Sequence, residues 1–329
     1  MSGRRIRWGI LSTARIAVRR VLPALLRSET GVAVAVASRD PARAREVADR
    51  FGIPRAYGSY EELLADQDVD AVYTPLPNSL HREWTIRAAQ AGKHVLCEKP
   101  LAVSSREAAE MVDACRRAGV LLQEAFMYRF HPQIETLQHL VRDGAVGTPW
   151  LVRAAFTFTV ARPEDIRLDP TLGGGGLLDV GCYGVNLSRL LLGEPHTAWA
   201  AAVFEGGVDV RLAAGLACAG AAALVDCGLR APYRQMAEVV GTAGTITLPR
   251  PFQPEEEPAV LVVRRGDREE QLVVEGTNQY TRMLDHMGRC LLEDRPPRYP
   301  PEDAVANMRV LDALAASART GETVRIEER

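Results

Sequence analysis

The strongest constraint on the fold is the regular alternation of short apolar runs with helical segments over the first 125 residues. Two of the runs, VAVAVA at 32–37 and AVYTP at 71–75, carry almost only apolar side chains. Strands that are apolar on both faces are typical of a parallel sheet covered on both sides. Their alternation with helices indicates βαβ units. We therefore predict an α/β domain with a parallel sheet over residues 1–125.

The expected elements of this domain follow from the apolar periodicity and from the residues that end each segment. Strands are predicted at 7–11, 32–37, 69–74, 94–97 and 120–124, and helices up to residue 26 and at 41–51, 79–91 and 104–118. Gly92 and Gly119 follow the last two helices, in the position where glycine commonly ends a helix.

After residue 125 the pattern changes to longer alternating strands, typical of half-buried antiparallel sheets. Strands are predicted at 150–160, 198–205, 208–219, 221–230, 235–241 and 244–248, with a hairpin over 259–274 that turns at Gly266-Asp267. Helices are predicted at 132–142, from the glycine run at 173–176 to residue 192, and at 278–293 and 301–319. We therefore predict an α+β domain over 126–329 with a large, mainly antiparallel open sheet.

Composition excludes several classes of protein. The net charge of −2 is spread without a Lys/Arg cluster, so nothing favours nucleic-acid binding. No apolar run reaches the length of a membrane-spanning helix, and the N-terminus has no signal-peptide pattern, so we expect a cytoplasmic protein. The six cysteines are scattered, so we expect buried thiols and neither disulfides nor a metal site.

The strands of the second half carry few charges on either face, including the run AAGLACAGAAAL. A sheet with two apolar faces needs a second cover, which a second copy of the chain can supply. We expect a homodimer or homotetramer formed through this sheet, on the face that carries Val208, Val210, Leu212 or their neighbours.

The first strand runs into a tight turn and a helix, the context of a dinucleotide-binding loop. The turn reads Ser12-Thr13-Ala14-Arg15-Ile16, with Ser12 and Ala14 where the fingerprint has glycine. Both residues are small enough for the backbone to approach a pyrophosphate, and the following helix start offers N–H donors. We predict that these five residues bind the cofactor and that the first domain is a Rossmann domain.

The second strand ends in Ser38-Arg39-Asp40, where an acid would hold the ribose 2′-hydroxyl of NAD. Ser38 and Arg39 instead suit a 2′-phosphate, which an arginine can bind through two N–H groups. NADP(H) is therefore the predicted cofactor. A strand ending one residue later would place Asp40 at the ribose and favour NADH, and Arg39 could instead be merely solvated.

The third strand is followed by Leu76-Pro77-Asn78 at the sheet edge that faces the ligand in open α/β sheets. Asn78 could also cap the next helix. His81 lies in the first turn of that helix, as either a cofactor contact or a structural residue. We take all four as cofactor-binding candidates.

Lysine is nearly absent from the chain: 38 of the 40 basic residues are arginine, and the two lysines are Lys93 and Lys99. A lysine retained in such a background indicates a position where a deprotonatable amine is needed, and chance survival is the alternative. Lys99 lies in Glu98-Lys99-Pro100 after the fourth strand, at the cofactor edge, where Glu98 could orient it or contact the cofactor. We predict a catalytic Lys99.

The second chemical candidate is the run of four glycines at 173–176, followed by Asp179 and Tyr183. Residues four apart share one helix face, and a glycine run lets the helix start approach a ligand closely. Such a pair is common on surface helices, so its significance depends on the N-terminal half.

Further substrate contacts are predicted around these two groups. Tyr128 and Arg129 follow the last strand of the first domain, although aromatic residues at such a junction are as often part of the packing. Arg162 and Arg167 lie in the loop before the glycine run. Tyr280 lies at the beginning of the penultimate helix.

These residues together resemble the Gfo/Idh/MocA family of NAD(P)-dependent oxidoreductases. The resemblance spans nearly the whole chain, and the segments that carry it are WGILSTARIA, VASRD, YTPLPNSLH, AGKHVLCEKP and GGGGLLDVGCYGVN. Tyr183 and Ser38-Arg39 make the chain similar to the NADP-dependent branch. That branch includes glucose–fructose oxidoreductase, dihydrodiol and xylose dehydrogenases and sugar 3-ketoreductases.

The resemblance implies an oxidoreductase that acts on a sugar-type substrate, a keto-sugar or alternatively an aldose or dihydrodiol. It also implies that Lys99 and Tyr183 flank the reacting carbonyl and that Asp179 holds a substrate hydroxyl. Proton transfer requires a group whose pKa lies near neutrality, and a tyrosine beside a lysine cation meets this need. We favour Tyr183 as proton donor and acceptor, with the reversed roles open. A non-catalytic NADP-binding regulatory protein is the alternative from another class.

Overall fold

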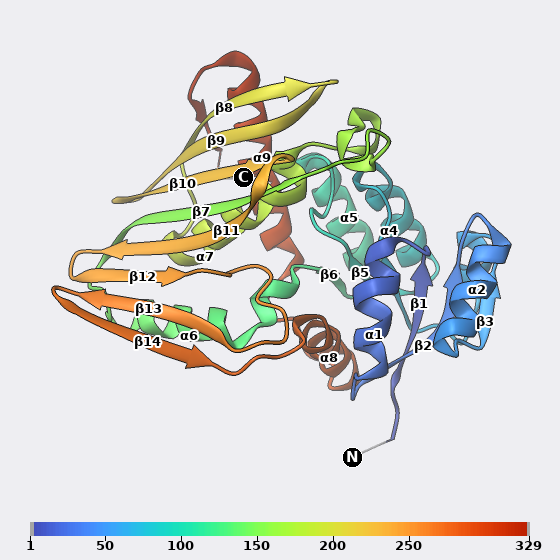
Figure 1. Cartoon of the computed structure of the whole chain (residues 1–329). Helices are drawn as coiled ribbons and strands as arrows, with labels where there is room; N and C mark the ends of the chain where they lie inside the picture. Colours follow the sequence, from blue (N-terminus) through green and yellow to red (C-terminus); the bar gives the residue numbers. More distant parts are fainter. Residues whose placement is uncertain (1–2, 328–329) are drawn as a thin grey trace. The chain divides into compact units, whose positions relative to one another are not determined.

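The computed structural model describes residues 3–327, which divide into two compact units (Figure 1). The first unit runs to Met127 and includes Asn278–Val305, and the second comprises Tyr128–Thr277 and the chain from Ala306. The division near residue 126 is close to the predicted one. The segment 278–305, which we had assigned to the second domain, is part of the first unit.

The first unit is built on a parallel sheet of six strands in the order β3-β2-β1-β4-β5-β6. The strands are β1 Ile6–Leu11, β2 Gly31–Ala37, β3 Arg55–Tyr57, β4 Ala71–Thr74, β5 His94–Cys97 and β6 Leu122–Glu124. The strand order reverses between β1 and β4, and ligands of such sheets bind at the carboxyl ends on either side of this point. This confirms the predicted Rossmann-type fold; only β3 lay outside the predicted strands.

Four of the six helices described in the first unit begin at a side chain that caps them. The six helices are α1 Leu22–Leu26 after a π turn at Ala17–Val21, α2 Pro41–Phe51, α3 Tyr60–Ala65, α4 His81–Gln90, α5 Ser105–Ala118 and α8 Gln279–Leu292. The capped helices are α2, α3, α5 and α8, whereas α1 and α4 have no side-chain cap. Ser104 caps α5 by accepting from the N–H of Glu107, and Gly119 ends it at φ +67°. Local residues therefore determine these boundaries.

Helix α8 belongs to the first unit because Asp285 fixes it there. Asp285 Oδ1 accepts hydrogen bonds from Ser28 Oγ at 2.5 Å, Thr30 Oγ1 at 2.9 Å and the N–H groups of Glu29 and Thr30 at 3.1 and 3.2 Å. A Cβ at Gly288 would collide with Thr30 Oγ1, so α8 also lies close to this loop. A buried carboxylate with four donors is a strong anchor.

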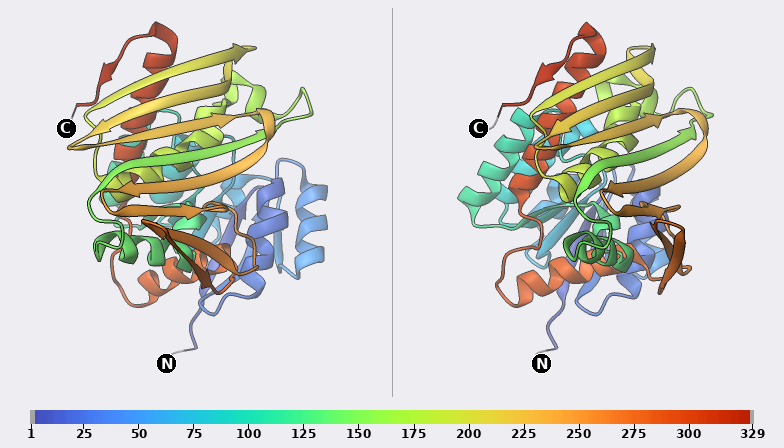
Figure 2. Two further views of the ribbon diagram at one scale, coloured as in Figure 1. Left: turned by 60° about the vertical axis from the view of Figure 1, so that its left-hand side comes forward. Right: turned by 90° about the vertical axis from the view of Figure 1, so that its left-hand side faces the viewer.

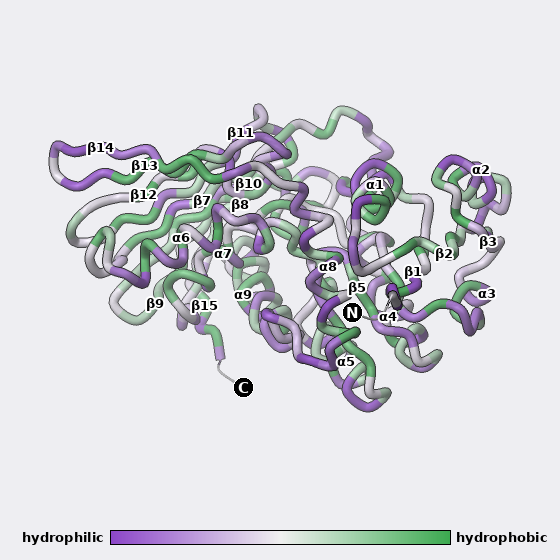
Figure 3. The backbone as a smooth tube through the Cα atoms, turned by 90° about the horizontal axis from the view of Figure 1, so that it is seen from below, coloured by the Kyte–Doolittle hydropathy of each residue, from purple (hydrophilic) through white to green (hydrophobic). Residues whose placement is uncertain are grey.

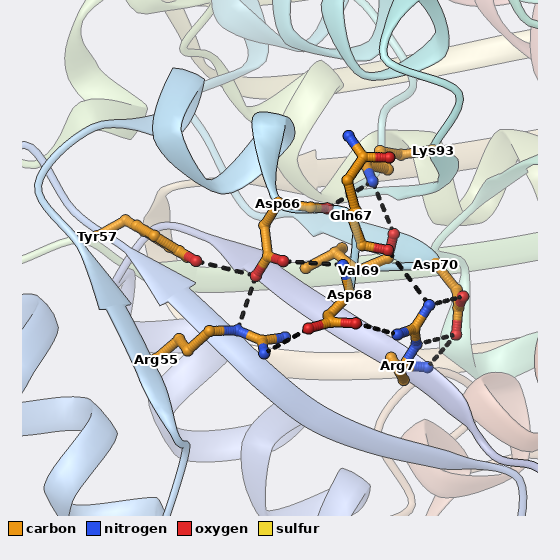
Figure 4. A network of polar contacts seen from close by, with 9 residues as sticks. All are labelled: Arg7, Arg55, Tyr57, Asp66, Gln67, Asp68, Val69, Asp70 and Lys93. Carbon is orange, nitrogen blue, oxygen red and sulfur yellow. Dashed lines mark hydrogen bonds and ion pairs between the residues drawn. The ribbon is translucent and has the colours of Figure 1, made fainter.

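A polar network joins the amino ends of the strands in the first unit (Figure 4). Arg7 donates three hydrogen bonds to the Asp70 carboxylate, two from its guanidinium and one from its backbone N–H. Lys93 Nζ donates to the carbonyls of Asp66 and Val69 at 2.7 and 2.9 Å. Burial lowers the pKa of Lys93. One of the two lysines therefore has a structural role at the edge opposite the carboxyl ends.

The second unit contains a sheet of nine strands in the order β14-β13-β12-β11-β7-β10-β9-β8-β15 (Figure 2). The strands are β7 Pro149–Thr159, β8 Thr197–Glu205, β9 Val208–Cys218, β10 Ala221–Gly228, β11 Arg230–Gly241, β12 Gly244–Leu248, β13 Ala259–Arg265, β14 Arg268–Val274 and β15 Val324–Arg325. Every pair is antiparallel except β7 with β10. The predicted mainly antiparallel sheet is confirmed, with the short β15 added.

Three helices belong largely to the second unit: α6 Pro132–Arg142, α7 Cys182–Leu192 after a π turn at Leu177–Gly181, and α9 Pro301–Thr320. Val208, Val210 and Leu212 are buried on the core face of β9, so the opposite face carries their neighbours. The first four residues of the edge strand β14, 268–271, are charged or polar and exposed (Figure 3), as is common for strands with an unpaired edge.

None of the helices found between residues 3 and 327 is long and apolar enough to cross a membrane. All six cysteines are free and buried, as predicted.

Candidate active site

The turn after β1 has the geometry of a dinucleotide-binding loop without its glycines. Ser12 has φ +154°, a value that favours glycine, and its Oγ accepts a hydrogen bond from the N–H of Ala14 at 3.0 Å. Thr13 is buried and contacts Ser38 Oγ through its hydroxyl at 3.5 Å. The predicted segment 12–16 thus reaches the end of β2 and leads into a helix start that suits a pyrophosphate.

The end of β2 decides which residue can read the ribose. β2 ends at Ala37, and the side chain of Asp40 caps α2 by accepting from the N–H groups of Ala42 and Arg43 at 3.0 and 3.4 Å. Asp40 is therefore committed to the helix, whereas Arg39 is exposed. This arrangement fits a 2′-phosphate and disfavours the alternative in which Asp40 binds the ribose.

His81 joins two loops at the carboxyl edge of the sheet. Its ring is fully buried, with Nδ1 3.0 Å from the carbonyl of Pro100 and Nε2 2.9 Å from that of Leu76. Burial lowers its pKa. Both ring nitrogens of His81 lie next to carbonyl oxygens, so neither faces a cofactor. The structure therefore gives His81 the role of holding these two loops in position, instead of the predicted contact with the cofactor. Pro77 and Asn78 are partly exposed in the first of these loops.

The Glu98-Lys99-Pro100 segment follows β5 at the same edge, and the Lys99-Pro100 peptide bond is cis. Glu98 accepts from Tyr73 Oη at 2.5 Å through Oε1 and from the N–H of Lys99 at 3.2 Å through Oε2. Burial and the charge of Glu98 raise the pKa of Tyr73 well above its usual value, and Tyr280 of α8 adds to this effect. Glu98 is thus held by its neighbours, and Lys99 extends from an ordered segment.

The second unit supplies Asp179, within the π turn that precedes α7. Asp179 Oδ2 is 2.7 Å from Nε of Arg167, whose Nη1 lies 3.2 Å from Asp165 Oδ1. The Arg167 guanidinium also lies over the ring of Phe158, and Asp179 is the main cause of the raised pKa of Arg167. Arg167 therefore holds the Asp179 carboxylate in place, a role that the sequence did not indicate.

Tyr183 is buried one turn further along the same helix, 3% exposed, in a cluster of aromatic rings. The ring centroids of Phe252, Phe156 and Tyr128 lie 5.3, 5.5 and 5.8 Å from that of Tyr183. Such packing fixes the direction of the phenol. Asp179 and Tyr183 are thus both positioned by neighbours within the second unit.

Of the further candidates, Tyr128 and Arg129 are buried and share one partner, Asn186. Its Oδ1 accepts from Tyr128 Oη at 2.5 Å and from Arg129 Nε at 2.6 Å. Tyr128 and Arg129 therefore stabilise helix α7 through Asn186. These hydrogen bonds give the two side chains a structural role and do not support the predicted contact with a substrate. Sequence reasoning missed Asn186, although it lies three residues after Tyr183. Arg162 is exposed.

No group of three or more His, Cys, Asp or Glu side chains within residues 3–327 is arranged to hold a metal ion.

Comparison with known proteins finds a matching family model for each half of the chain. Residues 6–126 match the family described as "Oxidoreductase family, NAD-binding Rossmann fold", and residues 134–247 match "GFO/IDH/MocA C-terminal domain". The chain is 43% identical to D-xylose 1-dehydrogenase (NADP(+)) 2 of Haloferax volcanii, over 97% of this chain and 99% of that protein.

Two solved structures are similar over the whole fold. A 3-ketoreductase from Actinomadura kijaniata in complex with NADP and TDP-benzene has a TM-score of 0.91 at 34% identity, covering 95% of this chain and 98% of that one. The aldose-aldose oxidoreductase from Caulobacter crescentus complexed with glycerol has a TM-score of 0.91 at 32% identity, covering 98% and 100%. Since both halves match and the relatives align end to end, the chain belongs to the Gfo/Idh/MocA family of oxidoreductases, as its motifs predicted.

Proposed function

We propose that this protein is an NADP(H)-dependent oxidoreductase that interconverts a carbinol and a carbonyl of a sugar or sugar derivative. Bound nicotinamide supplies or accepts the hydride. The observation that carries the proposal is that both candidate catalytic side chains are held in place by their neighbours. Lys99 lies on a segment that is hydrogen-bonded to Glu98, and Tyr183 lies in an aromatic cluster one turn after Asp179, which is paired with Arg167. The relatives are named as NADP-linked or NADP-bound sugar oxidoreductases, which supports this choice of cofactor and substrate.

In this proposal each residue has a separate task. Tyr183 gives a proton to the substrate oxygen, or takes one from it, as the hydride moves. The Lys99 cation favours the phenolate and orients the oxygen. Asp179 accepts a hydrogen bond from a neighbouring substrate hydroxyl, and Arg167 fixes the direction of its carboxylate.

The two ion pairs that Arg167 forms also bear on the substrate class. A nucleotide-linked sugar carries a pyrophosphate, which arginine side chains commonly bind. Of the two candidate arginines of this loop, Arg167 is occupied by Asp165 and Asp179, and Arg162 is exposed. The loss of one of the two cations favours an aldose over a nucleotide-linked keto-sugar as the substrate. The relative 43% identical is a xylose dehydrogenase, in agreement with this preference.

The function is tested by turnover of NADP⁺ with a panel of aldoses and of NADPH with a nucleotide-linked keto-sugar. Tyr183→Phe and Lys99→Ala are expected to lower kcat at least a hundredfold, about 3 kcal/mol of transition-state stabilisation. Tyr57→Phe is the matched control, since its hydroxyl binds Asp66 at the amino ends of the strands.

Lys99→Arg separates the roles of Lys99 and Tyr183: it keeps the positive charge and retains part of kcat if Tyr183 moves the proton. Near-normal turnover of Tyr183→Phe at all pH values would refute the assignment. Tight NADPH binding without turnover of any substrate would support the regulatory alternative instead.

We also propose that the open face of the nine-stranded sheet pairs with a second copy of the chain. This face carries Trp199, Val203 and Leu224 at 45, 45 and 48% exposure, with small residues such as Ala213 between them, and no helix of the second unit, within the described residues 128–277 and 306–327, lies over it (Figure 2). Large apolar side chains gathered on one face are unusual in a monomer, and a two-fold pair buries both faces at once. Light scattering should give a dimer or tetramer that Leu224→Asp dissociates and that Leu26→Asp, at the exposed end of α1, leaves intact. A stable wild-type monomer at micromolar concentration would refute this assembly.

A further inference from the structure

Two glycines of the run before Asp179, Gly174 and Gly175, are packed so closely that a Cβ would collide with neighbouring atoms, and Gly176 is tightly packed. A Cβ at Gly174 would lie 2.5 Å from the carbonyl oxygen of Arg167. At Gly175, where φ is +118°, it would collide with Oδ1 of Asp209, and at Gly176 it would lie 3.3 Å from Oδ2 of the same carboxylate. The run is therefore shaped around Asp209, a residue of β9 that the sequence analysis did not select.

Asp209 is bonded to the start of the helical segment that carries the candidate catalytic residues. Its Oδ2 accepts a hydrogen bond from the N–H of Leu177 at 2.6 Å. Leu177 is the first residue of the π turn, and its preceding residue, Gly176, offers no side chain to cap the turn. Asp209 thus acts as a helix cap supplied from 32 residues along the chain.

The ionised Asp209 cap lowers the free energy of unfolding at neutral pH. Burial raises the pKa of Asp209 to about 6, against the opposing effects of the N–H groups of Leu177 and Gly176 and of the Arg319 cation on α9. On β10, the charge of Asp209 in turn helps to raise the pKa of the Cys227 thiol. Because the folded state holds the proton more tightly than the unfolded chain, ionisation of Asp209 destabilises the fold as the pH rises from about 4 to 6. A group that lowers stability beside a candidate site is more simply explained by function than by folding.

We propose that Asp209 is a positioning residue of the active site, whose carboxylate anchors the first N–H of the π turn and thereby fixes Asp179 and Tyr183. The inference rests on the proposed function of those two residues. It predicts a site whose second-unit half loosens when the anchor is removed, while cofactor binding by the first unit is unchanged.

Asp209→Ala is expected to lower kcat at least tenfold and to leave the KM for NADPH within twofold of the wild type. Asp209→Asn keeps an acceptor for Leu177 and should restore much of kcat. It should also have an unchanged or higher melting temperature at pH 7.5, because the buried charge is gone.

A second arm does not depend on turnover. Amide hydrogen exchange over residues 177–183, measured without cofactor or substrate, should become at least tenfold faster in Asp209→Ala and in Gly175→Ala. The matched glycine control is Gly193→Ala, at φ +80° with open space around it, which should not change this exchange. Unchanged exchange and kcat in Asp209→Ala would overturn the proposal, as would a loss of kcat that merely follows a loss of melting temperature. If the wild type oxidises or reduces no sugar, the proposed function fails while the exchange arm still tests the anchor.

Discussion

Cofactor choice is the property that one exposed side chain should control. Arg39 lies beyond the end of β2, and its neighbour Asp40 has its carboxylate on the N–H groups of Ala42 and Arg43. Replacing Arg39 by alanine removes the guanidinium and leaves the strand end and the helix cap in place. We expect Arg39→Ala to raise the KM for NADPH and to leave that for NADH almost unchanged.

The size of the effect follows from the geometry. A charge-assisted contact between arginine and phosphate contributes roughly 1.5–3 kcal/mol, and each 1.4 kcal/mol is a factor of ten. Arg39 is exposed, so solvent screening favours the lower end of this range. The expected rise in the KM for NADPH is about tenfold to thirtyfold, with a wild-type preference for NADPH over NADH of at least tenfold in kcat/KM.

The assay is initial-rate kinetics with both cofactors at a fixed sugar concentration and two salt concentrations. Arg45→Ala is the matched control, since Arg45 is equally exposed and lies inside α2, away from the strand end. Asp40→Ala is the second control: loss of the cap should cost about 1 kcal/mol of stability without a change in cofactor preference.

Two results would refute this reasoning. Equal effects of Arg39→Ala on both cofactors would mean that Arg39 stacks on the adenine and does not read the phosphate. A switch of preference toward NADPH in Asp40→Ala would mean that Asp40 leaves its cap to bind the ribose of NADH.

The remaining predictions concern the clamp on Asp179, the anchor of α8 and the pH dependence of stability. Arg167→Met should lower kcat/KM about tenfold, since Asp179 loses the cation that orients its carboxylate; Asp165→Asn, which keeps that pair, should not. Asp285→Ala leaves several buried donors without an acceptor and should cost about 3 kcal/mol in urea unfolding, and a cost under 1 kcal/mol would contradict the anchoring role. Burial and nearby arginines lower the pKa of His286 to about 4. Since Asp209 contributes the opposite slope between about pH 4 and 6, the effect is measured in the Asp209→Asn background. There the free energy of unfolding should fall as the pH drops from 6.5 to 4, because the unfolded chain takes up a proton that His286 of the folded chain resists; adding His286→Gln should flatten that slope, and an unchanged slope would assign it to other groups.

Periodicity and local caps were sufficient to predict most elements. Helix α2 was predicted at 41–51 and lies at Pro41–Phe51, because Asp40 caps its start and Gly52 ends it at φ +65°. The hairpin turn at Gly266-Asp267 is likewise a property of neighbouring residues. The short β3 and α3 were missed, since elements of three and six residues carry too little periodicity to stand out.

The candidate residues themselves were found from composition and motifs, which record the chemistry that a site requires. Lys99 stood out because lysine is otherwise almost absent, and Asp179 and Tyr183 because of their spacing after a glycine run. Their partners could not be found in this way. Whether His81 contacts a cofactor or two carbonyls depends on loops from two different strands.

The same holds for the two anchoring carboxylates. Asp209 meets the glycine run from 32 residues away, and Asp285 meets Ser28 from 257 residues away. The sequence by itself determined most of the elements, the fold class and the candidate side chains, because these depend on near neighbours and on residue type. Only the tertiary structure decided which buried charges hold those side chains in place, because a carboxylate's partners are set by the packing of distant segments.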